Sequence, residues 1–198
     1  ADTLQEYSLH SLDSAFCSTQ FLDMKHGIFG CVPAEMLHVS GNGIMKYQMD
    51  IINNIVGSGQ NKKHKLHTLD VLHQNLVADS SRQSDRDMPR MSSRNGVTDG
   101  TKMSASERVG NMFLILCLLH TQDGKQLFAD GLDDIGVSLR AIKDCLKLQL
   151  SFEKWVNNSN SIEDVWKASS QVSDLICAIK TCFPRTDGHG WNIPKMHS

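Results

Sequence analysis

A carboxylate and an imidazole stand three residues apart in the segment Val32-Pro33-Ala34-Glu35-Met36-Leu37-His38 of this 198-residue chain. Pro33 suits the first turn of a helix, because the amide proton that proline lacks has no partner there. Side chains three residues apart on a helix share one face, so Glu35 and His38 could act on the same metal ion or substrate. The spacing predicts a helix start that presents an acid and an imidazole together.

Simpler roles fit the same residues. Glutamate is common in the first turn of a helix because it complements the helix dipole, and His38 could be a half-buried neighbour. A zinc site is another alternative, because Cys31 precedes Glu35 and His38 at short spacing and because His64 and His67 form a second close pair. The sequence leaves these alternatives open.

A second group of candidate residues lies in the polar middle of the chain. Residues 62–108 hold nine Lys and Arg against six Asp and Glu, in a chain whose net charge is −2. Contacts of such cations to phosphate oxygens supply most non-specific affinity for DNA. The alternative is a solvated loop whose aspartates cancel its field. The candidate DNA contacts are Arg82, Arg86, Arg90, Arg94, Lys102 and Arg108.

These segments resemble, in the same order, segments of eukaryotic cut-and-paste DNA transposases with an RNase H-like core, the CACTA, KDZ and Plavaka groups. The likeness rests on the acid-x-x-His segment at Glu35 and on residues 90–96, 101–108 and 190–197, and it extends from about Leu12 to the end of the chain. In that family the acid is usually Asp and is the second of three metal-binding carboxylates, whereas this chain has Glu.

The resemblance implies metal-dependent cleavage and transfer of DNA strands by an intact protein of which this chain is an internal fragment. Glu35 would be a catalytic ligand of Mg²⁺ or Mn²⁺, and His38 would orient it. The other two acids would lie before residue 1 and beyond residue 198, so the fragment alone would be inactive. The implied partners are duplex DNA at the transposon ends and a second copy of the chain. The alternative is a non-catalytic helical interaction or scaffold domain, a domesticated transposon remnant.

Composition sets broader limits. No apolar run approaches the length needed to span a bilayer, so no membrane partner is expected. The six cysteines form no CxxC pair and show no regular spacing, which favours reduced thiols and a nuclear or other intracellular location.

The hydrophobic pattern predicts a mostly α protein, a helical bundle, which the resemblance identifies with the helical insertion of an RNase H-like transposase core. We expect residues 1–32 to be an irregular or core-edge segment and residues 33–183 to be a helical domain with a polar loop at about 79–103. Residues 184–198 would extend toward a missing part of the core. Gly41 and Gly43 indicate a kink or a close packing contact in a helix over 33–56.

Three helices are expected in the second half of the chain. The capping-box residues Ser104 and Glu107 predict the start of the first, whose apolar stretch at 112–119 should be central and buried. A second helix would continue from Ile135 to Trp155, and a third would run to about residue 181. The second and third helices would shield the first from water.

Overall fold

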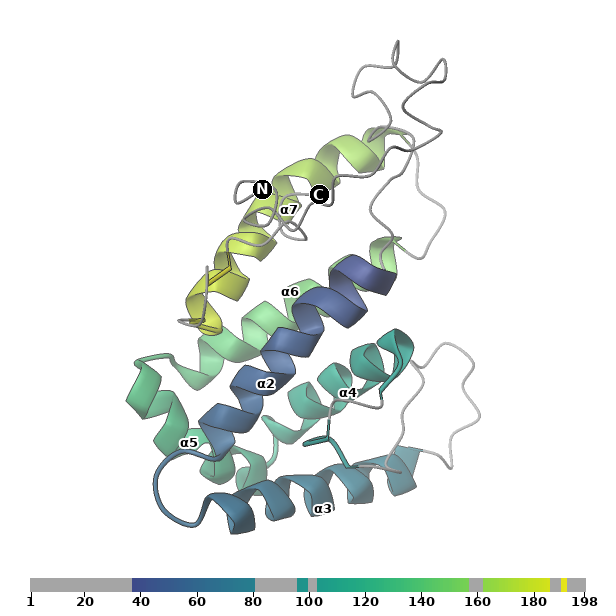
Figure 1. Ribbon diagram of the computed structural model, residues 1–198. Coiled ribbons are helices and arrows are strands. Elements are labelled where there is room, and N and C mark those ends of the chain that lie inside the picture. The colour runs from purple at the N-terminus through teal and green to yellow at the C-terminus, as the bar shows by residue number, and fades with distance from the viewer. Residues whose placement is uncertain (1–36, 81–95, 100–102, 157–161, 186–189, 192–198) are drawn as a thin grey trace, which may run out of the picture.

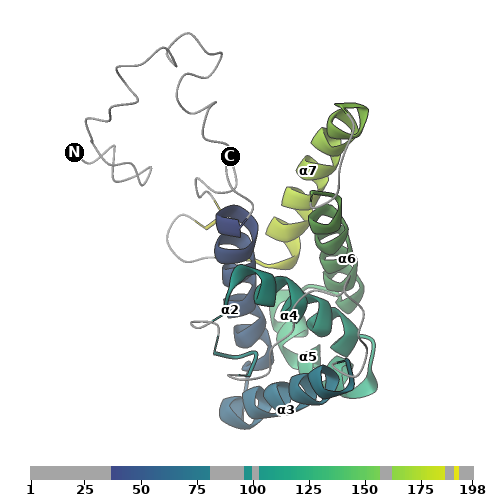
Figure 2. The same ribbon diagram turned by 90° about the vertical axis from the view of Figure 1, so that its right-hand side faces the viewer.

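The computed structural model describes residues 37–80, 96–99, 103–156, 162–185 and 190–191. Within these ranges the chain is mostly helical, as predicted, and no strand is present. Figures 1 and 2 both place α3 and α7 at opposite ends of the helical body. The elements in chain order are the π-helix η4 (Leu37–Ile44) and the α-helices α2 (Met45–Val56), α3 (Lys62–Ser80), α4 (Ala105–Leu118), α5 (Gln122–Ile135), α6 (Leu139–Val156) and α7 (Ile162–Cys182).

The two closely spaced glycines lie in the π-helix that runs directly into α2. Gly41 and Gly43 are both buried, and η4 packs against α4. A π-helix is a rare, locally widened form of the α-helix, so the irregularity expected at these glycines takes this form. Gly57 follows Val56 and caps α2, so the helix ends where the predicted range of 33–56 places its end.

Helix α4 lies at the centre of the fold. Its capping box is confirmed: the Ser104 hydroxyl accepts a hydrogen bond from the Glu107 amide, and the Glu107 carboxylate accepts one from the Ser104 amide at 2.8 Å. The apolar stretch is buried as expected, with Met112 and Ile115 fully enclosed. We expected the two helices that follow in sequence to shield α4 from water. Helix α6 does pack against it, but so do η4, α2 and α3, whereas α7 packs on α6.

The helix predicted from Ile135 to Trp155 is α6, which begins four residues later than expected, and it is preceded by a further helix, α5, that we did not predict. Helix α5 ends at Ile135, because Gly136 adopts a left-handed conformation with φ of 65° and closes the helix. Helix α6 then begins at Leu139, and the Ser138 hydroxyl accepts a hydrogen bond from the Ala141 amide at 3.1 Å. The sequence pattern missed the body of α5 because its apolar residues are sparse.

Two glycines in α5 lie at close contacts between backbones. A Cβ atom at Gly131 would collide with the carbonyl oxygen of Ile55 in α2, and one at Gly124 would collide with that of Leu118 in α4. Both glycines are buried. They weaken the helix signal in the sequence, but they allow α5 to approach its neighbours.

The described part of the C-terminal extension packs on the helical body. Trp191 is buried in the hydrophobic core, and its indole N–H donates a hydrogen bond of 2.6 Å to the carbonyl oxygen of Phe183. The Tyr47 ring of α2 meets the Trp191 ring edge-on at 6.2 Å between centroids. At Trp191, therefore, the chain contacts the helical domain. Residues 192–198 lie outside the described residues, so their extension toward a missing part of the core stays a prediction.

Candidate nucleic-acid interface

The residues with the strongest basic pattern connect α3 to a turn at 96–98. We call residues 81–95 the arginine segment, because it holds Arg82, Arg86, Arg90 and Arg94. The whole segment lies outside the described residues, and Lys102 further along the chain does too. Their contacts to DNA stay a prediction. The structure does describe how the chain that follows the segment is held.

Asp70 of α3 binds this turn with both oxygens of its carboxylate. Its Oδ1 accepts hydrogen bonds from the amides of Val97 at 2.7 Å and Thr98 at 3.0 Å, and its Oδ2 accepts one from the Thr98 hydroxyl at 2.7 Å. Asn53 of α2 donates a hydrogen bond of 3.1 Å to the Thr98 carbonyl oxygen. Because Val97 is also fully buried in the core, polar and apolar contacts both fix the turn.

Gly96 is required by the same contact. Its φ of 69° lies in the left-handed region that favours glycine. A Cβ atom there would lie 2.5 Å from Oδ1 of Asp70, closer than real side chains approach. We call Asp70, Gly96, Val97 and Thr98 the turn anchor. It fixes the chain directly after the arginine segment against α2 and α3.

Arg108, the remaining basic candidate, lies inside the protein. It is 5 % exposed and belongs to the first turns of α4. Burial lowers the pKa of its guanidinium, and the nearby charges of Asp50 and Glu107 oppose that shift. These surroundings favour a structural role between α2 and α4 over the phosphate contact that we expected.

The structure describes the predicted acid and imidazole only in part. Glu35 lies outside the described residues, and His38 belongs to η4, where its backbone is described but its side chain is not. No group of three or more His, Cys, Asp or Glu that could hold a metal ion occurs among the described residues. His64 and His67 are exposed on α3. The metal site at Glu35 stays a prediction.

A buried carboxylate that we did not single out from the sequence faces the π-helix. The Ser40 hydroxyl of η4 donates a hydrogen bond to Oε1 of Glu153 in α6, and both side chains are buried. Burial raises the pKa of Glu153, and the hydrogen bond from Ser40 opposes that shift. Because His38 lies in η4 and Glu35 lies just before this element in the chain, the contact holds the element next to the predicted acid against α6.

Two of the described cysteines, Cys145 and Cys182, are buried packing residues, whereas Cys117 is half-buried and Cys177 is exposed. Cys117, Cys145, Cys177 and Cys182 are free thiols. Burial and the neighbouring Cys182 raise the pKa of Cys145 to about 12, so its sulfur stays protonated and is a poor nucleophile.

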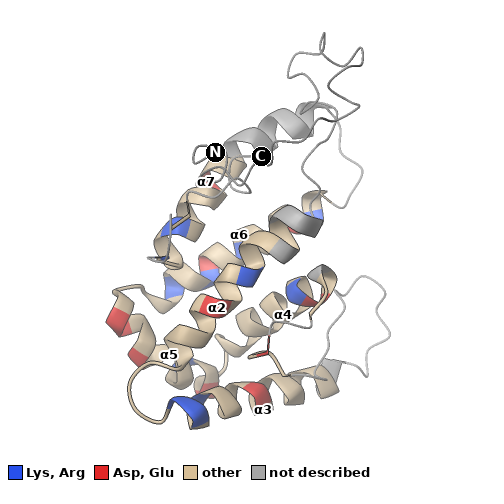
Figure 3. Ribbon diagram, viewed as in Figure 1, with Lys and Arg blue, Asp and Glu red and all other residues tan. Residues whose placement is uncertain are grey.

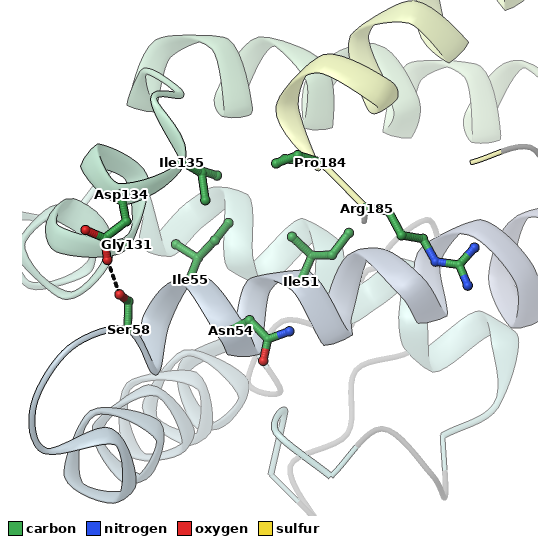
Figure 4. Close-up of a pocket in the computed structure, with 9 residues that line it drawn as sticks. All are labelled: Ile51, Asn54, Ile55, Ser58, Gly131, Asp134, Ile135, Pro184 and Arg185. Carbon is green, nitrogen blue, oxygen red and sulfur yellow. Dashed lines mark hydrogen bonds between the residues drawn. The ribbon is translucent and has the colours of Figure 1, made fainter. Parts of the chain in front are cut away.

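A pocket of about 170 Å³ lies between α2, α5 and the chain after α7 (Figure 4). Ile51, Ile55 and Ile135 form much of its lining, and Ser58 donates a hydrogen bond to Asp134 at one end. At the other end Arg185 points away from the pocket, and its guanidinium carbon lies 4.0 Å from the centroid of the Tyr47 ring. Asn54, Ser58 and Asp134 also line the pocket, so its wall combines apolar and polar groups.

Comparison with known proteins gives no relative. No family model, curated protein or solved structure matches the chain. Among the described residues, no helix combines the length and apolar character that crossing a bilayer requires.

Proposed function

We propose that this chain is part of a DNA transposase, that its helical domain contacts duplex DNA through the arginine segment, and that Glu35 is a catalytic carboxylate. Four segments whose order resembles that of cut-and-paste transposases support the enzyme class. The turn anchor is the observation that carries the DNA contact, because it joins a segment with four regularly spaced arginines to a rigid helical body.

The anchor has a physical consequence for binding. Residues 81–95 are attached at one end to Ser80, the last residue of α3, and at the other to Gly96, beside Asp70. A segment held at both ends loses less conformational freedom on binding than a free chain does. Loops placed by a rigid scaffold commonly carry binding residues. The arginine segment fits this arrangement.

The catalytic part of the proposal concerns two residues of this chain, the carboxylate of Glu35 as a metal ligand and His38 as the residue that positions it. Its carboxylate would supply one oxygen ligand to Mg²⁺ or Mn²⁺, which in such enzymes activates the attacking oxygen and stabilises the leaving one. His38 would orient the carboxylate by a hydrogen bond. The resemblance places the two further acids outside residues 1–198. In a longer protein that contains this chain, Glu35→Gln should therefore abolish strand cleavage, and Glu35→Asp should retain part of it.

The DNA contact is tested by reversing two charges in the arginine segment. The Arg90→Glu/Arg94→Glu variant of the 198-residue chain should bind duplex DNA of any sequence more weakly than the wild type, because phosphate contacts carry no sequence information. A matched control is Lys62→Glu/Lys63→Glu, which makes the same change of charge at exposed positions in the first turn of α3. Equal binding by both variants, or no binding by the wild type at low salt, would favour the helical scaffold instead.

A further inference from the structure

Four cations form a stripe along one face of α6. Arg140, Lys143, Lys147 and Lys154 follow the spacing i, i+3, i+7 and i+14, which places them within an arc of about 60° on a helix of 3.6 residues per turn. Arg140 is 90 % exposed and Lys147 is 53 % exposed at the side chain. With a rise of 1.5 Å per residue, the stripe is about 21 Å long. We call these four residues the basic stripe.

The buried face of α6 points away from the basic stripe. Ile142, Cys145, Leu146 and Gln149 are all buried, as is Glu153. Their mean direction lies about 135° around the helix from that of the basic stripe. Arg140, Lys147 and Lys154 are exposed, whereas Lys143, at the edge nearer the buried face, is half-buried. Figure 3 shows basic positions recurring along α6.

A neighbouring helix adds positive charge beside the stripe. Lys125 in the first turn of α5 is exposed, and so is His120, just after α4. Desolvation lowers the pKa of His120, and the positive charges of Lys143, Lys147 and Lys125 lower it further, which favours the neutral imidazole. Helices α5 and α6 thus both contribute lysines near His120.

Negative charge at the stripe is limited. Asp144 pairs with Arg140 at 3.6 Å and with Lys147 at 3.7 Å. Lys143 has Arg140 three residues before it and Lys147 four residues after it, and like charges at such spacing destabilise a helix. An anionic partner that covers this face would offset the repulsion between the like charges and so stabilise the helix.

We propose that the basic stripe is a second surface that binds the phosphates of duplex DNA, on an element remote in sequence from the arginine segment. This inference rests on the proposed function, since it assigns a further contact to the same partner. A length of about 21 Å corresponds to roughly six base pairs along the duplex axis, at 3.4 Å per phosphate on each strand. Flexible lysines suit such sequence-independent contacts, because each acts as a point charge on a long stem.

The test measures duplex DNA binding by the 198-residue chain over a range of salt concentrations. Lys143→Glu/Lys147→Glu should weaken binding and reduce the slope of log K against log salt by about 1.8, because each lost phosphate contact contributes about 0.9. Lys62→Glu/Lys63→Glu, with the same change of net charge, should leave the slope near the wild-type value. Lys143→Gln/Lys147→Gln should show the same direction of change, and thermal melting should establish that each variant is folded.

The outcomes separate this inference from the proposed function. If Arg90→Glu/Arg94→Glu weakens binding but the stripe variants match the control, the stripe is not a DNA contact and the proposed function stands. If only the stripe variants weaken binding, the basic stripe contacts DNA and the proposed contact through the arginine segment is wrong. A wild-type chain that binds vesicles of anionic phospholipid but not duplex DNA would overturn both.

Discussion

Gln48 of α2 and Gln149 of α6 exchange two hydrogen bonds in the protein interior. Each side-chain amide donates to the carbonyl oxygen of the other, at 2.8 and 2.9 Å, and both side chains are buried. A reciprocal pair of this kind is satisfied in one relative position of the two helices. It therefore sets the register of α2, which continues from η4, against α6.

Replacing one glutamine should cost more than replacing both. Gln149→Leu would leave the amide of Gln48 buried without its partner and should lower the free energy of unfolding by about 1–3 kcal/mol. Gln48→Leu/Gln149→Leu removes both polar groups and should recover much of that loss. Urea unfolding of the two single variants and the double variant gives the coupling directly. Additive losses would mean that the pair does not act as a unit.

Gly131→Ala should destabilise the packing of α5 on α2. The added methyl group would collide with the carbonyl oxygen of Ile55, so the helices must separate, at a cost of about 1–3 kcal/mol. Gln126→Ala, at an exposed position of the same helix, controls for the better helix propensity of alanine. The melting temperature should fall for the first variant only. A rise for Gly131→Ala would contradict the close approach of α2 and α5.

Removing the turn anchor should release the arginine segment. Asp70→Ala deletes the acceptor of three hydrogen bonds, and Gly96→Ala would place a Cβ atom against Asp70 at a positive φ. Both variants should be cut faster by trypsin at the arginines of residues 81–95, because the segment is then held at one end only. They should also bind DNA more weakly. Cleavage at the wild-type rate would show that Asp70 does not restrain the segment.

Glu153 should make the protein less stable as the pH rises. Burial raises its pKa in the folded state above the ordinary value of 4.5, so the folded protein holds this proton more tightly than the unfolded chain does. The contribution of Glu153 to stability is therefore present at pH below 4.5 and declines as the pH rises to the raised pKa. Glu153→Gln should lessen this decline and keep an acceptor for Ser40. Parallel stability profiles for the two proteins, from pH 4 to pH 8, would refute the shift.

The parts of the fold that local patterns encode could be predicted from the sequence. The capping box at Ser104, the apolar stretch of α4 and the glycine stop at Gly57 depend on residues close together in the chain, and the structure agrees with each. Helix α5 could not be found in this way, because Gly124 and Gly131 lower its local helix propensity and are explained only by contacts with α4 and α2. Its end at Gly136 also places the start of α6 at Leu139, four residues after the start that we predicted.

The candidate site was less accessible to sequence reasoning. The turn anchor joins Asp70 to residues 27 and 28 positions later, and no local pattern predicts such a pairing. The burial of Arg108 likewise depends on α2 and α4 packing together. The basic stripe, in contrast, follows from the 3.6-residue period of α6, on which its four cations share one face, although we did not single it out from the sequence.

The most direct test of the DNA-contacting domain is the salt dependence of duplex binding by the 198-residue chain, compared with a variant in which Arg82, Arg86, Arg90 and Arg94 are all alanine. If each arginine contacts a phosphate, the slope of log K against log salt should fall by about 3.6 in the variant, with the helical content unchanged. The control Lys62→Ala/Lys63→Ala should keep the wild-type slope. The same slope in the wild type and the quadruple variant, or no binding by either at low salt, would contradict the proposal that the arginine segment binds DNA.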